Sequence, residues 1–325
     1  MSVTFTIGSP FVSSVSAVLE AVPVPPVTAV GRPRWSVVIP VHNCAGFLAS
    51  ALPEVLAQLA GRDDAEIIVV DDASSDEPGR VVERLGRDRV SFRPNPSHLG
   101  AIGTFNRCLQ LASGELVHLL HGDDLVLPGF YRAMESALAD EATVAAVCRV
   151  QDVDADGVPT YVTRSYRKGT GVWPDALDVL AVSNRVRAPG IVVRRSAYEG
   201  VGGYRSDLPH AADWEMWTRL AASGPVVFVD QVLAGYRRHG ASDTSVRAET
   251  GQNIRERVTA IAVIAAHLPP SRRARITRRA LAYAVVFATR TTMASVRAGR
   301  WSAARRQGGE ALRCGWLLLR GAPTG

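Results

Sequence analysis

The sequence has few cysteines and only one lysine. Cys44, Cys108, Cys148 and Cys314 are far apart and form no CxxC pair, which argues against a zinc knuckle or a disulfide framework and predicts reduced thiols. Lys168 is the only lysine among 37 basic residues, and it does not lie in a GxxxxGK(S/T) phosphate-binding loop. No GxGxxG motif follows the first predicted strand either. P-loop enzymes and Rossmann dehydrogenases are therefore both disfavoured.

Long apolar runs are also absent. Near the C-terminus the longest run spans residues 280–288, well below the ~20 residues that a helix needs to cross a bilayer. No charged side chain precedes Glu20, so the basic n-region of a secretory signal is missing. With 47% apolar and 21% charged residues, the chain has the composition of a folded globular protein. We expect a cytoplasmic protein without a membrane span.

Charge is unevenly distributed along the 325 residues. Residues 270–325 hold twelve arginines and a single acidic residue, Glu310, which is a local balance of +11 within a net charge of +6. The remainder of the chain is therefore acidic, at −5. The near-complete preference for arginine over lysine is typical of a compositional bias of the genome, so it predicts no nucleic-acid partner.

Three regions are expected from the pattern of prolines, apolar runs and charges. Residues 1–33 contain four prolines after position 22 and are predicted to be a loosely ordered extension. Residues 34–245 alternate short apolar runs with amphipathic stretches, which predicts an α/β domain. Residues 246–325 are predicted to form a basic helical region with helices at 246–267, 271–298 and 301–319.

The first part of the α/β domain has βαβαβαβ order. This order predicts a mostly parallel sheet with helices on both faces. The predicted strands are residues 35–39, 66–70, 90–93 and 116–120, and the predicted helices are residues 47–60, 78–85 and 101–112.

Polar side chains follow each of these four strands. In an open parallel sheet, ligands bind beyond the carboxyl ends of the strands, so these residues are expected to meet at one edge. Two of the strands are followed by paired aspartates, Asp71-Asp72 and Asp123-Asp124. Each acidic residue could instead cap a following helix. Adjacent carboxylates repel each other unless a cation or donor offsets them, and carboxylates without cysteine favour Mg²⁺ or Mn²⁺. A metal-bound nucleoside diphosphate fits such a cleft.

Several motifs together resemble the inverting glycosyltransferases of family 2. In the first half these are residues 37–43 (VVIPVHN), 67–76 (IIVVDDASSD), Asn95, 99–100 (LG), Asn106, 114–115 (GE) and 122–124 (GDD). In the second half they are residues 202–205 (GGYR), 212–217 (ADWEMW) and 235–239 (GYRRH). The resemblance implies a GT-A fold that binds a nucleotide-sugar donor in its first half and an acceptor in its second.

The resemblance also implies roles for individual residues. Asp72 would recognise the nucleobase, and Asp123 would contact the ribose. Asp124 and His239 would hold Mg²⁺ or Mn²⁺, although His121 stands where many relatives have another acid. Asp213 would act as the catalytic base on the acceptor hydroxyl. Further residues expected in the nucleotide-sugar site are Pro40, His42, Asn43, Asn95, Gly100 and Asn106.

Each role has a simpler alternative. Asp213 could cap its helix, and His239 could be a solvated loop residue. Trp214 and Trp217 suit either the core or an acceptor platform.

The predicted function is metal-dependent, inverting transfer of a sugar from a nucleoside diphosphate, UDP favoured, to an acceptor hydroxyl in polysaccharide or glycolipid biosynthesis. A catalytically silent nucleotide-sugar binder and a nucleotidyltransferase are the alternatives. The acceptor would be a glycan or a lipid-linked molecule. The basic C-terminal helices additionally suggest peripheral contact with the inner face of the membrane.

Overall fold

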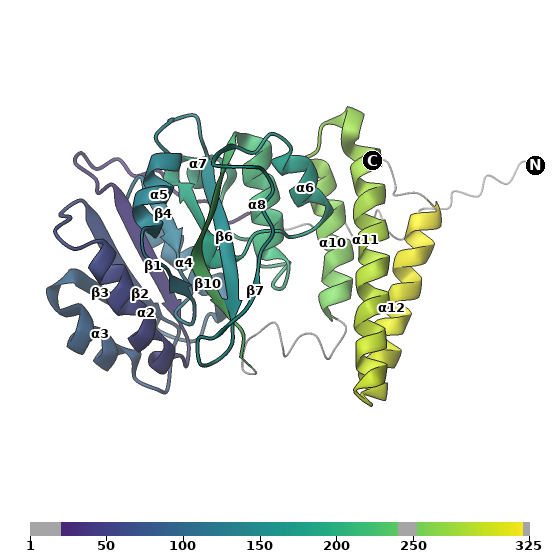
Figure 1. Cartoon of the computed structure of the whole chain (residues 1–325), viewed down its shortest axis with the longest axis horizontal. Helices are drawn as coiled ribbons and strands as arrows, with labels where there is room; N and C mark the ends of the chain where they lie inside the picture. The colour runs from purple at the N-terminus through teal and green to yellow at the C-terminus, as the bar shows by residue number, and fades with distance from the viewer. Residues whose placement is uncertain (1–20, 240–251, 321–325) are drawn as a thin grey trace, which may run out of the picture.

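The computed structural model describes residues 21–239 and 252–320, which form one α/β layer structure followed by a helical extension (Figure 1). The described strands build a ten-stranded sheet whose central order is β3-β2-β1-β4-β9-β6-β10-β5. Strand β7 pairs with β6, and β8 pairs with β10. The strands are β1 (Trp35–Val41), β2 (Ala65–Asp71), β3 (Val90–Pro94), β4 (Leu116–Leu119), β5 (Leu125–Val126), β6 (Ala145–Val153), β7 (Pro159–Val162), β8 (Gly171–Val172), β9 (Ile191–Arg194) and β10 (Val226–Arg237).

The first four strands that the sequence predicts are present and parallel. Strand β1 pairs with β2 and β4 on its two sides, and β2 pairs with β3. Their β-branched residues are buried on both faces, which is why they read as continuous apolar runs. Strand β1 continues two residues beyond the predicted end at Ile39, so Pro40 lies inside a strand, paired with Val70.

The second part of the sheet is mixed rather than parallel. Strand β9 runs antiparallel to both β4 and β6, whereas β6 and β10 are parallel. The short strand β5 returns antiparallel to β10 through Leu125 and Gly235. This pairing places the segment after β4 beside the end of β10, although the two are more than 100 residues apart in sequence.

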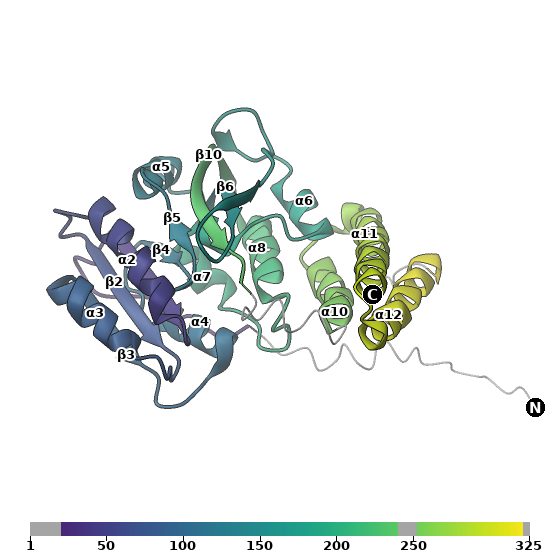
Figure 2. The same cartoon turned by 60° about the horizontal axis from the view of Figure 1, so that its bottom comes forward.

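Helices cover both faces of the sheet, with an apolar core on each side (Figure 2). Alternation along β1 explains the two cores, because Val37 and Ile39 point to one face and Val38 to the other. The first face is covered by α2 (Ala45–Gln58), α3 (Pro78–Gly86) and α5 (Phe130–Ala137), and the second by α4 (Gly100–Leu111), α6 (Ala176–Val182), α7 (Arg195–Val201) and α8 (Ala212–Ser223).

Three C-terminal helices pack beyond α8, on the side of the molecule away from β3 (Figures 1 and 2). They are α10 (Gln252–Ala266), α11 (Pro270–Arg297) and α12 (Trp301–Arg320). Their shared apolar core includes Trp214 of α8, so the extension is joined to the α/β part through buried side chains. Residues 246–251 of the first predicted helix lie outside the described residues. Within the described part of the chain, no helix is long and apolar enough to span a membrane.

Residues 21–33 are the described part of the N-terminal extension predicted for residues 1–33, and their first half is held by the folded domain. Residues 21–33 form no helix or strand, but Val24 is buried in the core against α4 and α7. Gly203 N–H donates to the carbonyl of Val22 at 2.7 Å, and the Arg195 side chain donates to the carbonyl of Pro25 at 3.0 Å. Residues 21–27 therefore belong to the folded domain. Residues 1–20 lie outside the described residues.

Candidate active site

Asp72 lies at the carboxyl end of β2 in a pocket of hydrogen-bond donors. Its side chain is 2% exposed, and its Oδ1 accepts hydrogen bonds from Asn95 Nδ2 at 2.9 Å and from Leu99 N–H at 2.7 Å. Burial raises the pKa of Asp72, but the hydrogen bonds from Leu99, Asn95 and Thr104 outweigh it and lower the pKa below its usual value. The structure therefore holds Asp72 as a carboxylate.

Two exposed histidine rings flank the Asp72 carboxylate. His42 Nδ1 donates to the Asp72 carbonyl at 2.8 Å, and His98 Nδ1 lies 3.0 Å from Asp72 Oδ2. The ring centroids of His42 and His98 are 4.5 Å apart. Asn43 Nδ2 lies 3.0 Å from His42 Nε2 and donates to it, while Asn43 Oδ1 accepts from Ser75 N–H at 2.8 Å. These contacts suit an imidazole that donates from Nδ1 and accepts at Nε2.

Two glycines shape the same edge of the sheet. Gly100 begins α4 with φ +74°, and a Cβ there would point into open space. At Gly122 a Cβ would lie 2.6 Å from Val41 Cγ1 and 3.0 Å from Cys44 Sγ. Only glycine lets the segment after β4 approach the end of β1 so closely, and this approach positions the aspartates that follow it.

Asp123 and Asp124 have different surroundings. Asp124 is fully buried; its Oδ1 accepts from Arg237 N–H at 2.9 Å, whereas its Oδ2 has no hydrogen-bond partner among the described residues. Burial, with a smaller contribution from the charge of Asp123, raises the pKa of Asp124 well above its usual value. Asp123 is half-buried, and its Oδ2 lies 2.9 Å from His239 Nε2.

These residues fit a divalent cation. Ligand atoms of His121, Asp123 and Asp124 all lie within 4.8 Å of one another. The partnerless Oδ2 of Asp124 is the kind of buried anion that a bound cation would neutralise. His121 Nδ1 is 3.7 Å from this oxygen, so the histidine at the expected place of a further acid supplies a nitrogen there. His239 lies next to this group because its Nε2 contacts Asp123 Oδ2.

Asp213 lies in the first turn of α8, but it is not the residue that precedes the helix. Ala211 occupies the N-cap position, and Asp213 Oδ1 accepts from the N–H of its neighbour Trp214 at 2.6 Å. Asn184 Nδ2 donates to Asp213 Oδ2 at 2.7 Å. Burial raises the pKa of Asp213 in spite of these two hydrogen bonds. A half-buried carboxylate with a raised pKa is suited to accept a proton.

Electrostatic contacts connect the acidic groups into one site. Burial lowers the pKa of His121, and the charges of Asp123 and Asp213 partly oppose this effect, so both carboxylates lie near His121. Burial raises the pKa of the Cys44 thiol to about 12, and Asp123 and Asp71 add to this rise through their charges. The ends of β1, β2 and β4 and the start of α8 therefore face the same region.

Three other expectations for individual residues have clear outcomes in the structure. The Asn106 side chain is occupied by the backbone of Tyr204, to which it donates at 2.9 Å and from which it accepts at 2.7 Å. This contact fastens the GGYR segment to α4 and uses one donor and the acceptor atom of the amide. Pro40 is buried in β1, with its carbonyl accepting from Gly122 N–H. Trp214 and Trp217 are 2% and 3% exposed and belong to the core.

The sequence analysis missed several charged residues around the site. Arg237 Nε donates to the Asp123 carbonyl at 2.9 Å, and its guanidinium lies over the Phe47 ring. Arg187 forms a two-point ion pair with buried Asp152 and also lowers the pKa of Asp124 through its charge. Within α8, Arg219 pairs with fully buried Glu215 and donates to the carbonyl of Gly203. Arg237 lies in the GYRRH motif, but arginines are so frequent in this chain that the sequence alone assigned no role to it, to Arg187 or to Arg219.

The fold is that of a glycosyltransferase. Residues 36–201 match the Glycosyl transferase family 2, and the chain belongs to this family. Among curated proteins, it is 29% identical to the uncharacterized protein MT1568 of Mycobacterium tuberculosis, over 70% of this chain and 74% of that protein. It is 27% identical to the putative glycosyltransferase EpsE of Bacillus subtilis, over 59% of this chain and 68% of that protein.

Solved structures show the same fold. The S. aureus protein TarS, residues 1–349 in complex with UDP-GlcNAc, superposes with a TM-score of 0.63 at 18% identity, covering 76% of this chain and 71% of that one. The mannosyltransferase PcManGT of Pyrobaculum calidifontis, in complex with GDP-Man and Mn²⁺, superposes with a TM-score of 0.54 at 19% identity, covering 93% and 90%. The chain thus has a GT-A fold with additional C-terminal helices.

Proposed function

We propose that this protein transfers a sugar from a nucleoside-diphosphate sugar, with UDP favoured, to an acceptor hydroxyl, with inversion at the anomeric carbon. The observation that supports the proposal is that His121 lies near both the Asp123-Asp124 pair and Asp213. A cation at the acidic pair and a proton acceptor at Asp213 would then act in one region. The solved relatives that bind UDP-GlcNAc, or GDP-Man with Mn²⁺, support the donor class.

The donor half of the site would be built from Asp72 and the acidic pair. Asp72, kept ionised by its donors, would accept hydrogen bonds from the N–H groups of the nucleobase, and the exposed rings of His42 and His98 offer surfaces for stacking. Asp123, Asp124 and His121, with His239 beside them, would hold Mg²⁺ or Mn²⁺. A bound divalent cation stabilises the negative charge of a departing nucleoside diphosphate.

Asp213 would act on the acceptor. A sugar hydroxyl is a weak nucleophile, and a positioned carboxylate that removes its proton as the bond forms accelerates such reactions by roughly 10²–10⁴. Asn184 holds one oxygen of Asp213, so the carboxylate is fixed in orientation. Attack from the side opposite the leaving diphosphate in a single displacement inverts the anomeric centre.

The test is turnover with defined donors. The protein would be incubated with UDP-glucose, UDP-galactose, UDP-N-acetylglucosamine and GDP-mannose in the presence and absence of MnCl₂. We expect one donor to raise the melting temperature by mass action and to release nucleoside diphosphate in a metal-dependent reaction. NMR of the product should show a β-linkage from an α-linked donor. Binding without turnover would identify a silent binder, and release of pyrophosphate would identify a nucleotidyltransferase.

We further propose that the outer face of α11 and α12 contacts an anionic membrane, which suits a glycolipid or polysaccharide precursor as acceptor. Four large apolar side chains on α12 are strongly exposed, at 68%, 79%, 51% and 88%: Trp301, Leu312, Trp316 and Leu319. They lie on one side of the helix, flanked by the exposed arginines 305, 306 and 313. Exposed aromatic and aliphatic residues beside arginines are typical of helices that lie in a lipid interface.

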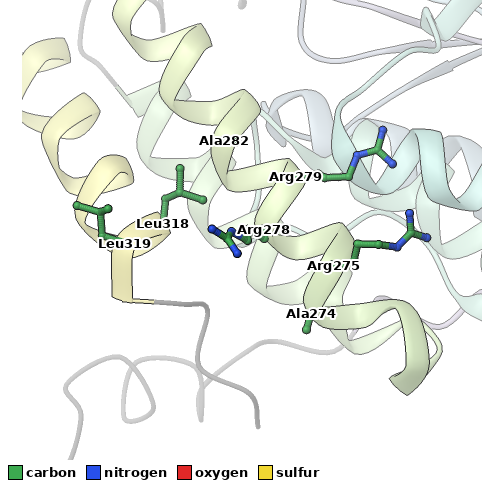
Figure 3. Close-up of a pocket in the computed structure, with 7 residues that line it drawn as sticks. All are labelled: Ala274, Arg275, Arg278, Arg279, Ala282, Leu318 and Leu319. Atoms are coloured by element: carbon green, nitrogen blue, oxygen red, sulfur yellow. The ribbon is translucent and has the colours of Figure 1, made fainter.

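A hollow between α11 and α12 continues this surface (Figure 3). Figure 3 shows Arg278 on the side of α11 that faces Leu318, whereas Arg275 and Arg279 point away from α12. Such a hollow offers the guanidinium of Arg278 to a lipid phosphate and leucines to an acyl chain. Its lining residues are Ala274, Arg275, Arg278, Arg279, Ala282, Leu318 and Leu319.

Co-sedimentation with vesicles tests the membrane contact. We expect binding to phosphatidylglycerol vesicles at low salt, much weaker binding to phosphatidylcholine vesicles, and loss of binding in the Trp316→Ser, Leu319→Ser double variant. The matched control is Val158→Ser, which removes an exposed apolar side chain in the loop before β7. Equal sedimentation of the double variant and the control would contradict the proposal.

A further inference from the structure

Two arginines near Asp213 are held among aromatic rings, without an acidic partner among the described residues. The Arg257 guanidinium of α10 lies 5.0 Å from the ring centroid of Trp214, 5.8 Å from that of Tyr283 and 4.4 Å from that of Phe287. The Arg185 guanidinium lies 4.9 Å from the centroid of the same Tyr283 ring. Two cations therefore share one aromatic ring.

Their hydrogen-bonding groups are largely unused. Nε of Arg185 and both Nε and Nη1 of Arg257 are buried, and they have no hydrogen-bond partner among the described residues. The only hydrogen bond of these two guanidinium groups within the described part of the chain is a long one, 3.5 Å, from Arg185 Nη1 to the Tyr283 hydroxyl. Neither arginine forms a salt bridge within the described ranges. Buried donors without partners are costly, so a structure that keeps three of them is prepared for an acceptor group.

The local charge around these two arginines is also positive. Burial lowers the pKa of Arg257, and the neighbouring charge of Arg185 lowers it further, whereas Tyr283 and Asp213 raise it. Burial raises the pKa of the Tyr283 hydroxyl, yet the charges of Arg185 and Arg257 and hydrogen bonds from Ser183 and Arg185 outweigh it and leave the pKa below its usual value. An oxyanion is the group that would offset this excess, because guanidinium binds phosphate and carboxylate through paired donors.

Contacts of neighbouring residues place this pair near Asp213, the proposed base. Arg185 follows Asn184, which donates to Asp213, and Arg257 lies against Trp214, which follows Asp213. The arginines whose charges act on Asp124 are different ones, Arg237 and Arg187. The Arg185–Arg257 pair thus belongs to the Asp213 side of the site rather than to the side of the acidic pair.

From this geometry we propose that Arg185 and Arg257 form a subsite for an oxyanion of the acceptor, so that the accepting molecule is an acidic saccharide carrying a phosphate or a carboxylate. The inference rests on the proposed function of Asp213 as the base. It also gives α10 and α11 a role, because they supply Arg257, Tyr283 and Phe287; Figure 1 shows α10 beside α8 and α11 beside α10.

The binding test uses inorganic phosphate and glucuronate as probes, on the full chain with ¹⁵N-labelled arginine. The Nε resonances of Arg185 and Arg257 would be assigned by their loss in the Arg185→Gln and Arg257→Gln variants. We expect both resonances to shift and saturate together with phosphate, glucuronate or both, and the stronger probe identifies the acidic group. Methyl glucoside, which is neutral, should produce no shift. Arg290, exposed on α11, is the control. Shifts no larger than those of Arg290 with either probe would overturn the proposal.

The transfer test separates this inference from the proposed function. With the identified donor, release of nucleoside diphosphate to water reports on the donor site and needs no acceptor. We expect Arg257→Gln to raise the KM for an acidic saccharide by about 10- to 100-fold, well beyond any change in this release, which is the effect of losing a hydrogen bond to a charged group. Arg257→Lys, which keeps the charge, should lose less, and Arg290→Gln nothing.

Each outcome has a defined meaning. Absence of donor hydrolysis in the wild-type protein would contradict the proposed function, while the resonance shifts would still decide on the oxyanion subsite. Equal loss of hydrolysis and transfer in Arg257→Gln, with no rescue by lysine, would make Arg257 a packing residue and overturn the subsite. Equal KM values for neutral and acidic saccharides in the wild-type protein would overturn it too.

Discussion

The backbone N–H of Arg237 donates to one oxygen of Asp124 at 2.9 Å, and the second oxygen of this buried carboxylate accepts no hydrogen bond from the part of the chain that the structure describes. The contact joins the end of β10 to the segment after β4, across 113 residues of sequence. It fixes the orientation of Asp124 while leaving one oxygen available. The arrangement is unfavourable for a carboxylate on its own and favourable once a cation is bound.

Asp124→Asn should stabilise the metal-free protein. Asparagine keeps the acceptor for Arg237 N–H and removes the buried charge, so we expect the free energy of unfolding at pH 7 to rise by about 1–3 kcal/mol. The same variant should lose the rise in melting temperature that MnCl₂ causes in the wild-type protein. Asp123→Asn, at a half-buried position, is the control and should change the metal-free stability little. Destabilisation of Asp124→Asn in metal-free buffer would contradict this account.

Asp213→Asn should lower kcat by roughly 10²–10⁴ and leave donor affinity nearly unchanged, because only the proton transfer from the acceptor is lost. Turnover measured by nucleoside-diphosphate release in the presence of acceptor, with donor affinity from calorimetry, checks this. Turnover equal to that of the wild-type protein would remove Asp213 from the mechanism.

Asn184→Ala should move the acid limb of the pH profile. The hydrogen bond from Asn184 lowers the pKa of Asp213, against the larger opposite effect of burial, so its removal raises that pKa further. Asp213 must be ionised to act as a base. We therefore expect kcat/KM to fall at a higher pH in Asn184→Ala than in the wild-type protein, with the plateau at high pH less affected. A profile that drops uniformly at every pH would indicate displacement of the residue instead.

Asn106→Ala tests whether this residue serves the fold or the donor. Both polar atoms of its amide bind the backbone of Tyr204, so the variant leaves a buried N–H and a buried carbonyl without partners. The expected loss is about 1–3 kcal/mol in urea unfolding. Donor affinity at low temperature, where the variant is folded, should be unchanged. Weaker donor binding with wild-type stability would return Asn106 to the nucleotide-sugar site.

His118 makes stability sensitive to acid. Its Nε2 donates to the carbonyl of Pro189 at 3.1 Å, and burial lowers its pKa from 6.5 to about 3. Between these values the unfolded chain binds the proton and the folded protein does not. Stability from this group is therefore complete above pH 6.5 and decreases as the pH falls toward 3, by at most about 1.4 kcal/mol per pH unit. His118→Gln should show a shallower decrease in urea midpoint between pH 7 and pH 4, and an unchanged slope would contradict the assignment.

The sequence by itself determined the parallel half of the sheet and the motifs at its edge. β-branched runs of five to seven residues alternate with amphipathic helical stretches, and local propensity and burial are enough to specify such elements. The same pattern predicted that Asp72 lies at the ligand-binding edge of the sheet, because parallel strands bring their carboxyl ends together.

Only the tertiary structure decided how the second half completes the site. The antiparallel strands β9 and β5, the contact between Arg237 and Asp124, and the attachment of Asn106 to Tyr204 all join segments whose pairing depends on long-range register. The same holds for Arg185 and Arg257. The sequence does not distinguish them from the chain's many other arginines, and only tertiary packing places them near Asp213 without an acidic partner among the described residues. Local sequence specifies which elements form, whereas desolvation and charge proximity, which give these residues their chemistry, exist only after the chain has folded.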